Sequence, residues 1–251
     1  MGLTAFRVSW RCGLRRMATA MDPVQRELMS ETIALVDVDD RVLGSASKRE
    51  CHERTAEHPG GRLHRAFSVF LFDTTGRLML QQRAKSKITF PMMWTNTCCS
   101  HPWHTEAELD DAQRIGIKRA AVRKLGDELG IRSVDPNDLR FITRIEYQAF
   151  QGDGIWVEHE MDYILFCQVS AVKIDANPNE VAAWRWVTKQ ELHDLMGRRD
   201  SLGMVFTPWF DLIAQGQLGS WWDRLSDVIS KEPNESKIHR LGVYDAPTGS
   251  K

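Results

Sequence analysis

The order in which predicted strands and helices follow one another constrains the fold of this chain more than any single motif. The first regular segments read as β-strands, and helices enter only after residue 105. Predicted strands lie within residues 32–44 (two strands around an Asp-Asp turn), 66–72, 77–83, 139–147, 156–167 and 183–187. Predicted helices lie within residues 105–129 and 189–196, and from residue 207 past residue 222. Strands that dominate first and then mix with helices indicate a single α/β domain, a mixed β-sheet covered by helices.

Local signals mark several boundaries of these elements. Gly130 is a good stop for the helix before it, and Thr188 is a good N-cap for the helix after it. Gly152-Asp153-Gly154 predicts a hairpin turn between two long strands. The polar stretch 48–64, which contains Pro59-Gly60-Gly61, predicts a loop that crosses between sheet elements.

Both ends of the chain differ from its centre. Residues 1–28 form a predicted N-terminal extension, residues 29–228 the folded domain, and residues 229–251 a loose polar tail. The extension carries Arg7, Arg11, Arg15 and Arg16, with no acid before Asp22. An Arg-rich, acid-poor start is typical of a transit peptide to a plastid or mitochondrion. The alternative is a disordered extension of a cytoplasmic protein, with other starts at Met17 or Met21.

Composition excludes several classes of partner. A net charge of −1 over 251 residues gives no overall field that would attract nucleic acid or an acidic membrane. No stretch approaches the roughly 20 apolar residues that span a bilayer. The five cysteines are an odd number in a large chain, so we expect free thiols in a reducing compartment and no disulfide framework.

The segment Thr95-Asn-Thr-Cys-Cys-Ser-His101 places two thiols, a hydroxyl and an imidazole side by side. A thiolate is a nucleophile or proton acceptor, and an imidazole can bind a metal or move a proton. Taken alone, the segment could equally be a turn with two small buried cysteines and a structural histidine.

Glu158-His159-Glu160 lies on a predicted strand, where alternation points the two carboxylates to the same face. Two carboxylates side by side repel each other unless they share a cation or a proton. His52, His64 and His101 are possible partners, and three imidazoles with two carboxylates suit zinc or manganese. An exposed acidic strand face remains the alternative.

Basic residues gather after the strand that ends near Arg83. Arg83, Lys85 and Lys87 follow closely on one another, and Lys48 and Lys124 are further candidates. Such groups near a turn can hold a diphosphate through charge-assisted hydrogen bonds. Lys85 fits a solvated loop better.

The segment Arg123-Lys-Leu-Gly-Asp-Glu-Leu-Gly-Ile131 resembles the end of the Nudix box. Arg123, Leu125, Glu128, Gly130 and Ile131 match it, whereas Lys124 and Asp127 replace two of its glutamates. The upstream half of the box is also missing, since Leu109 and Ile115 stand where it has Gly and Glu. This pattern suggests a Nudix-like fold without the hydrolysis, in which Glu128 holds a single magnesium ion.

From about residue 29 to residue 223 the chain resembles the type I isopentenyl-diphosphate delta-isomerases, which have a Nudix-like fold. Six motifs in order carry the resemblance: His64-Arg-Ala-Phe-Ser-Val-Phe-Leu-Phe72, Gln81-Gln-Arg83, Lys87-Ile-Thr-Phe-Pro91, Thr95-Asn-Thr-Cys-Cys-Ser-His-Pro102, Gly154-Ile-Trp-Val-Glu-His-Glu-Met-Asp-Tyr163 and Thr207-Pro-Trp-Phe210. The family interconverts isopentenyl diphosphate and dimethylallyl diphosphate in isoprenoid biosynthesis. A proton is added at C4 and another is removed from C2, through a tertiary carbocation.

The resemblance implies a role for each matched position. Cys99 and Glu160 are the opposed acid/base groups, Tyr147 hydrogen-bonds Glu160, and Trp209 faces the cation, although a core tryptophan at a helix start would read alike. The implied ligands of the zinc or manganese ion are His52, His64, His101, Glu158 and Glu160. The implied diphosphate-binding residues are Lys48, Arg83, Lys87, Ser100 and Lys124, with Mg²⁺ on Glu128. Cys98 is expected to be a packing residue.

Two other functions compete with this interpretation. A Nudix hydrolase acting on a nucleoside diphosphate derivative would need the lost glutamates and would have no use for Cys99 and Glu160. A structural zinc module would use four Cys or His ligands in short paired spacings, unlike the scattered, carboxylate-rich set here. We therefore expect a small diphosphate as the substrate, no nucleic-acid partner, no membrane span, and a monomer or weak dimer.

Overall fold

The structure, a computed structural model, describes residues 21–233 and 235–245. The predicted transit peptide therefore lies almost wholly outside the described residues. Among the described helices, none is long and apolar enough to cross a membrane.

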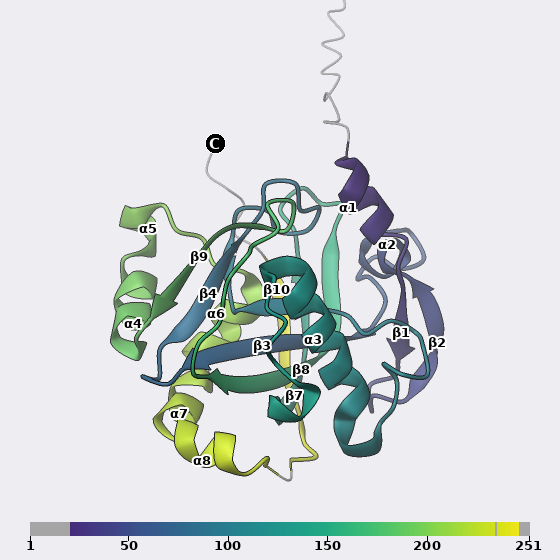
Figure 1. The fold of residues 1–251 in the computed structure, drawn as a ribbon. Helices are drawn as coiled ribbons and strands as arrows, with labels where there is room; N and C mark the ends of the chain where they lie inside the picture. The colour runs from purple at the N-terminus through teal and green to yellow at the C-terminus, as the bar shows by residue number, and fades with distance from the viewer. Residues whose placement is uncertain (1–20, 234, 246–251) are drawn as a thin grey trace, which may run out of the picture.

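A large mixed β-sheet forms the centre of the molecule (Figure 1). Its strands are β1 (Thr32–Val36), β2 (Val42–Ser47), β3 (His64–Asp73), β4 (Leu78–Arg83), β5 (Trp94–Thr95), β6 (Cys98–Ser100), β7 (Arg140–Phe150), β8 (Val157–Val169), β9 (Val181–Val187) and β10 (Ile238–Asp245). The main order is β10-β7-β8-β3-β1-β2, and β4 to β6 and β9 branch from it. The predicted strands are confirmed, apart from small shifts at their ends.

Strand β3 lies between the strands that carry the two predicted acid/base groups. It pairs in parallel with β8, where His64 is opposite Glu160, and antiparallel with β6, where Ser68 is opposite Cys99. Nine of its ten residues are buried, as its apolar sequence requires. Cys99 and Glu160, distant in sequence, are therefore placed on two neighbours of one strand.

Helices cover the two faces of the sheet, which confirms the predicted architecture. They are α1 (Pro23–Leu28), α2 (Lys48–His52), α3 (Ile115–Leu129), α4 (Lys189–Gly197), α5 (Arg199–Leu202), α6 (Pro208–Gln215), α7 (Leu218–Asp223) and α8 (Leu225–Ser230), with short 3₁₀ turns at Ala112–Arg114 and Pro136–Asp138. The apolar face of α3 packs on one side of β3, against Phe67, Val69 and Leu71. Helices α6 to α8 pack on the other side, against Phe70 and Phe72 (Figure 1).

Two expectations about helices are wrong in detail. The predicted loop after residue 47 begins with α2, which Ser47 caps together with Glu50 in a capping box. Five residues are too few to show a helical period, so only the cap signal was present. The predicted C-terminal helix is three short helices, because the backbone leaves helical geometry at Gly216 (φ −91°, ψ −89°) and again at Arg224.

The structure differs from the predicted N-terminal extension, residues 1–28, and from the predicted C-terminal tail, residues 229–251. Residues 238–245 form β10, which pairs in parallel with β7, so the region after residue 228 is not simply a loose tail. Helix α1 lies inside the expected extension 1–28 and packs on the domain through the buried Gln25. Both elements depend on contacts with distant residues, which local sequence does not reveal.

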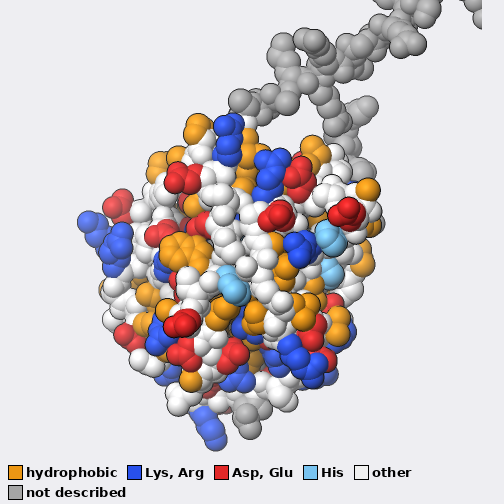
Figure 2. All heavy atoms as spheres, turned by 90° about the vertical axis from the view of Figure 1, so that its right-hand side faces the viewer, with side chains coloured by type: hydrophobic (Ala, Val, Ile, Leu, Met, Phe, Trp, Pro, Cys, Tyr) orange, Lys and Arg blue, Asp and Glu red, His pale blue; other side chains and the backbone are white. Residues whose placement is uncertain are grey.

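Acidic and basic side chains are interspersed on the face of the molecule shown in Figure 2. This arrangement agrees with the near-zero net charge of the chain.

Candidate active site

A small cavity on the α6–α8 side of the sheet brings together most of the predicted site residues. It is lined by Lys48, Arg83, Lys87, Thr89, Cys99, Ser100, His101, Tyr147, Glu158, Glu160 and Trp209. Alternation along β6 explains why one thiol of the pair is included and the other is not. Cys99 packs on the α6–α8 side, whereas Cys98 packs among the residues beneath α3.

Five of the lining or adjacent side chains form a compact cluster of possible metal ligands. One ligand atom from each of them lies within 4.8 Å of all the others, and all five residues are buried. They are His52, His64, His101, Glu158 and Glu160. The three imidazole ring centroids are 4.5–5.0 Å apart. The histidines come from α2, the start of β3 and the end of β6, so three separate parts of the chain converge on β8.

Backbone carbonyls orient two of these rings. His52 Nδ1 lies 2.6 Å from the carbonyl oxygen of Lys48, and His64 Nδ1 lies 2.7 Å from that of Arg62. A ring that donates from Nδ1 has a lone pair on Nε2, which is the arrangement seen in metal-binding histidines. The Nε2 atoms of both rings are buried without a hydrogen-bond partner among the described residues.

A carboxylate of the cluster also lies close to a ring nitrogen without bonding to it. His52 Nε2 lies 2.7 Å from Glu158 Oε2, yet the contact lacks hydrogen-bond geometry, and Glu158 Oε2 also has no other partner among the described residues. Atoms that approach without bonding one another are expected where all of them point at a shared cation. Buried atoms of this kind are costly if left unpaired, so the donor set fits a divalent ion with nitrogen and oxygen ligands.

The charges of the cluster determine its protonation. Burial, together with the nearby charges of Lys48 and His64, holds the pKa of His101 well below its usual range, which keeps the ring neutral. Burial raises the pKa of Glu160, but the nearby His64 ring, 3.6 Å away, and a hydrogen bond from Tyr147 bring it below its ordinary value. Glu160 is therefore a carboxylate at neutral pH. His101 Nε2 lies 2.9 Å from Glu160 Oε1.

Cys99 lies beside a guanidinium group. Arg83 Nη1 is 3.8 Å from Cys99 Sγ, and the rest of this guanidinium is held by the backbone carbonyl oxygens of Thr89 and Phe90. Burial raises the pKa of Cys99 to about 12, although the charge of Arg83 opposes the shift. The thiol therefore carries its proton at neutral pH, while Glu160 lacks one.

The indole of Trp209 is fixed from several sides. Its Nε1 donates to Asn96 Oδ1 at 3.2 Å, and Phe90 meets it edge-on with ring centroids 5.5 Å apart. The Arg83 guanidinium carbon lies 5.5 Å from the centroid of the Trp209 ring. The Trp209 side chain is buried in the core and also lines the cavity. It therefore fits both predictions, a core tryptophan at a helix start and a residue that faces the substrate cavity.

The predicted basic residues divide into two groups. Lys48, Arg83 and Lys87 line the cavity, and burial with repulsion from Lys87 and Lys124 lowers the pKa of Lys48 to about 8. Lys85 is exposed, as expected for a solvated loop.

Lys124 and Glu128 do not line the cavity. They lie one turn apart on α3, with Lys124 Nζ 3.5 Å from Glu128 Oε1. Gln81 donates to the same carboxylate at 3.1 Å. Burial and the nearby charge of Glu128 raise the pKa of the Cys98 thiol well above its ordinary value.

Sequence reasoning missed three residues that touch the site. Thr89 lines the cavity, Asn96 holds Trp209, and Glu180 forms an ion pair of 2.5 Å with Lys87. Thr89 and Asn96 lie inside recognised motifs and could have been named. Glu180 lies in an irregular segment before β9 and carried no local signal.

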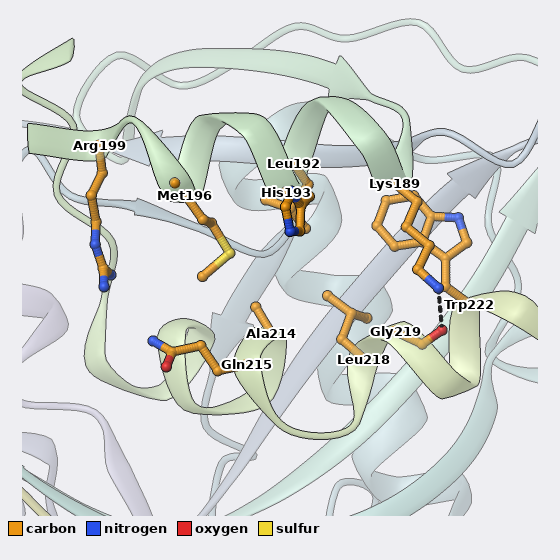
Figure 3. A pocket seen from close by; sticks show the side chains of 11 residues that line it. Lys189, Leu192, His193, Met196, Arg199, Ala214, Gln215, Leu218, Gly219 and Trp222 are labelled. Atoms are coloured by element: carbon orange, nitrogen blue, oxygen red, sulfur yellow. Dashed lines mark hydrogen bonds between the residues drawn. The ribbon is translucent and has the colours of Figure 1, made fainter. Parts of the chain in front are cut away.

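A larger hollow of about 450 Å³ lies between α4 and α6–α7, away from this cavity. Figure 3 shows the apolar side chains that line it from both sides, among them Leu192, Met196, Ala214, Leu218 and Trp222. Its two long cations already have partners, since Lys189 pairs with Asp223 at 2.7 Å and Arg199 with Asp211 at 2.8 Å. Among the described residues, the cluster of buried titratable side chains lines the cavity around Cys99 and not this hollow.

The chain is similar to one family model and to several named proteins that agree with one another. Residues 62–210 match the family model described as the NUDIX domain. The chain is 45% identical over 223 residues to Isopentenyl-diphosphate Delta-isomerase 1 of Mesocricetus auratus, which covers 88% of this chain and 96% of that protein. It is 46% identical over 224 residues to the protein of the same name from Bos taurus, with 88% and 96% covered. It is 48% identical over 226 residues to Isopentenyl-diphosphate delta-isomerase IDI1 of Gibberella zeae, with 88% and 87% covered.

Proposed function

The chain belongs to the NUDIX family and, within it, to the isopentenyl-diphosphate delta-isomerases, and we propose that it interconverts isopentenyl diphosphate and dimethylallyl diphosphate. The observation that carries this proposal is the position of Cys99 and Glu160. They lie on the two strands that flank β3, on the same side of the sheet, and line one cavity. Moving a double bond by one carbon requires two proton-transfer groups arranged in this way.

The protonation states of Cys99 and Glu160 suit the reaction. The Cys99 thiol holds a proton and the Glu160 carboxylate does not, so the pair carries one transferable proton. In the proposed mechanism one group gives a proton to C4 of the alkene, and the other accepts the proton released from C2. No atom other than hydrogen enters or leaves the substrate, and the reverse reaction exchanges the two roles.

The intermediate between these transfers is a tertiary carbocation at C3. Trp209 supports it in this proposal, because an aromatic face attracts a cation without bonding to it. Tyr147 holds Glu160 in place through its hydrogen bond of 2.5 Å. The buried walls of the cavity exclude water, which would otherwise trap the cation as an alcohol.

We assign the diphosphate of the substrate to Lys48, Arg83, Lys87 and the Ser100 region, all of which line the cavity. Lys124 contributes positive charge from α3 without touching the cavity, and Glu128 is the proposed ligand of a magnesium ion that accompanies the diphosphate.

The cluster of His52, His64, His101, Glu158 and Glu160 would hold zinc or manganese. When bound, such an ion lowers the proton affinity of a carboxylate that it contacts. The orientation of His52 and His64 by backbone carbonyls, and their unpaired Nε2 atoms, support this assignment.

The purified protein with magnesium should convert isopentenyl diphosphate into an acid-labile allylic diphosphate without releasing phosphate. Release of phosphate with no allylic product would instead favour the Nudix hydrolase alternative. The altered Nudix segment, with Lys124 and Asp127 in place of glutamates, argues against hydrolysis.

We propose that the enzyme is cytoplasmic, or that it lies in a plastid or mitochondrion if residues 1–21 act as a transit peptide. Fusion of the first 30 residues to a fluorescent reporter tests this, and a diffuse cytosolic signal would count against the transit peptide.

A further inference from the structure

Lys87, one of the cavity lysines, is held by a buried carboxylate that belongs to no site motif. Lys87 Nζ lies 2.5 Å from Glu180 Oε2, and the two side chains are only 10% and 3% exposed. Burial raises the pKa of Glu180, but the charges of Lys87 and Lys124 bring it down to about 2. Glu180 is therefore a carboxylate at neutral pH.

Glu180 is held in turn by helix α1. Gln25 Nε2 donates to Glu180 Oε1 at 2.7 Å, and the side chain of Gln25 is buried within the domain. Gln25 also bonds Asn179 Oδ1 at 2.7 Å, and Asn179 Nδ2 donates to the helix-capping Asp22 at 3.1 Å. Helix α1 is thus attached at two points to the segment that carries Glu180.

The loop that carries Lys87 is attached to the same segment. Ala84 N donates to the carbonyl oxygen of Glu180 at 2.9 Å, and Ser86 Oγ donates to that of Asn179 at 2.7 Å. Residues after α1 also reach the second cavity lysine. The backbone N–H of Lys48 donates to the carbonyl oxygen of Glu31 at 2.8 Å.

From these contacts we propose that Gln25 and Glu180 are positioning residues of the diphosphate site, through which helix α1 sets the position of the Lys87 ammonium group. The inference rests on the proposed function, because it takes Lys87 to bind the diphosphate of the substrate. It adds α1, an element outside the predicted domain, to the groups that determine substrate affinity.

The physical reason is preorganisation. A free lysine loses much side-chain freedom when it binds an anion, and a lysine already held in place loses less. Loss of the Gln25 amide removes one of the contacts that fix Glu180, so the Glu180–Lys87 pair is less well positioned and Lys87 loses more side-chain freedom when the diphosphate binds. This effect weakens diphosphate binding and leaves proton transfer at Cys99 and Glu160 unchanged.

The test is the variant Gln25→Met, which keeps the length and helix propensity of the side chain but cannot hydrogen-bond Glu180. Calorimetric titration of the metal-loaded protein with inorganic pyrophosphate and magnesium should show three- to tenfold weaker binding, roughly the effect of freeing one long side chain. The KM for isopentenyl diphosphate should rise by the same factor, with kcat within twofold of wild type.

Two further variants separate positioning from general damage. Val24→Ala changes an exposed residue of the same helix and should leave pyrophosphate affinity unchanged. In a Lys87→Met background, Gln25→Met should alter that affinity less than twofold, because its effect passes through Lys87. Equal losses in both backgrounds, or no loss in the wild-type background, would overturn the proposal. If Gln25→Met does not fold, Gln25→Asn tests the same contact with the amide kept but shortened.

The outcomes also separate this inference from the proposed function. Pyrophosphate binding does not require turnover, so it reports on Gln25 whatever the reaction is. A wild-type protein that makes no allylic product contradicts the proposed function alone. A wild-type isomerase whose pyrophosphate affinity ignores Gln25 contradicts the positioning role alone.

Discussion

Tyr147 Oη donates a hydrogen bond of 2.5 Å to Glu160 Oε2, and the two residues are direct partners across the antiparallel strands β7 and β8. The sheet itself therefore sets the distance between the phenol and the carboxylate. Burial and the charge of Glu160 raise the pKa of Tyr147 well above its ordinary value, so the phenol keeps its proton and remains a donor.

Tyr147→Phe should reduce kcat by about ten- to a hundredfold while the protein stays folded. The estimate follows from the roughly 1.5–3 kcal/mol that a hydrogen bond to a charged group contributes. Steady-state kinetics measure the effect. Tyr163→Phe is the matched control, since it removes a buried phenol that bonds Asp40, away from the cavity. Equal loss of kcat in both variants would show a general packing effect.

Cys99→Ala and Glu160→Gln should each abolish nearly all turnover, because each removes one of the two proton-transfer groups. Thermal unfolding and circular dichroism should show both variants folded. Cys167→Ala removes another buried thiol, near the C-terminal end of β8, and should retain activity. Near-wild-type turnover by either site variant would make the role assigned to that residue wrong.

The value of kcat/KM should fall as pH rises through about 8. Burial and repulsion from Lys87 lower the pKa of Lys48 to about 8, so its ammonium group is charged below that pH and neutral above it. A neutral amine binds the diphosphate less well, and kcat/KM follows ionisation of the free enzyme. Lys48→Arg should remove this alkaline decline below pH 9, because arginine stays charged. A decline that persists in Lys48→Arg would assign it to another group.

Elemental analysis of the purified protein should find about one zinc or manganese ion per chain. His64→Ala should lose this ion and the activity with it, because His64 Nε2 is a buried nitrogen whose lone pair has no hydrogen-bond partner among the described residues. His193→Ala serves as the control, since its side chain is exposed on α4. Full metal content in His64→Ala would exclude it from the ligand set. Chelation followed by re-addition of single metals would distinguish zinc from manganese.

Trp209→Leu should lower kcat more than Trp209→Phe does. Both variants lose the hydrogen bond to Asn96, but only phenylalanine keeps an aromatic face for the carbocation. Comparing kcat of the two variants isolates that face. Equal losses would mean that Trp209 contributes through packing against Phe90 and its other neighbours.

The sequence predicted the longer strands of the central chain, because apolar runs and alternation are local signals, whereas β5, β6 and β10 were not predicted. The strand Ala66–Phe72 and the N-cap at Thr188 are examples that the structure confirms. The members of the candidate site were recognisable from short motifs. Their arrangement was not, because it depends on which strands flank β3, and residues as far apart as 99 and 160 carry no local sign of that pairing.

What the sequence did not reveal depends on contacts between distant residues. Strand β10 exists through pairing with β7, and Gln25 is buried through Glu180, about 150 positions away. Glu128 matched the Nudix segment and Lys124 lies within it, yet the position of α3 places both outside the cavity lining. Motifs thus named the candidate residues, while long-range packing decides which of them line the cavity.

The branching of the sheet at β3 has a consequence for how this protein can change. The proposed proton-transfer groups Cys99 and Glu160 are spaced by strand register, whereas the lysines proposed to bind the diphosphate lie at α2 and on the loop after β4. The two tasks are therefore structurally modular. A change in the loops can retune which diphosphate is captured without altering the spacing of Cys99 and Glu160. A one-residue insertion in β3 would turn its side chains to the opposite face and disrupt the chemistry outright.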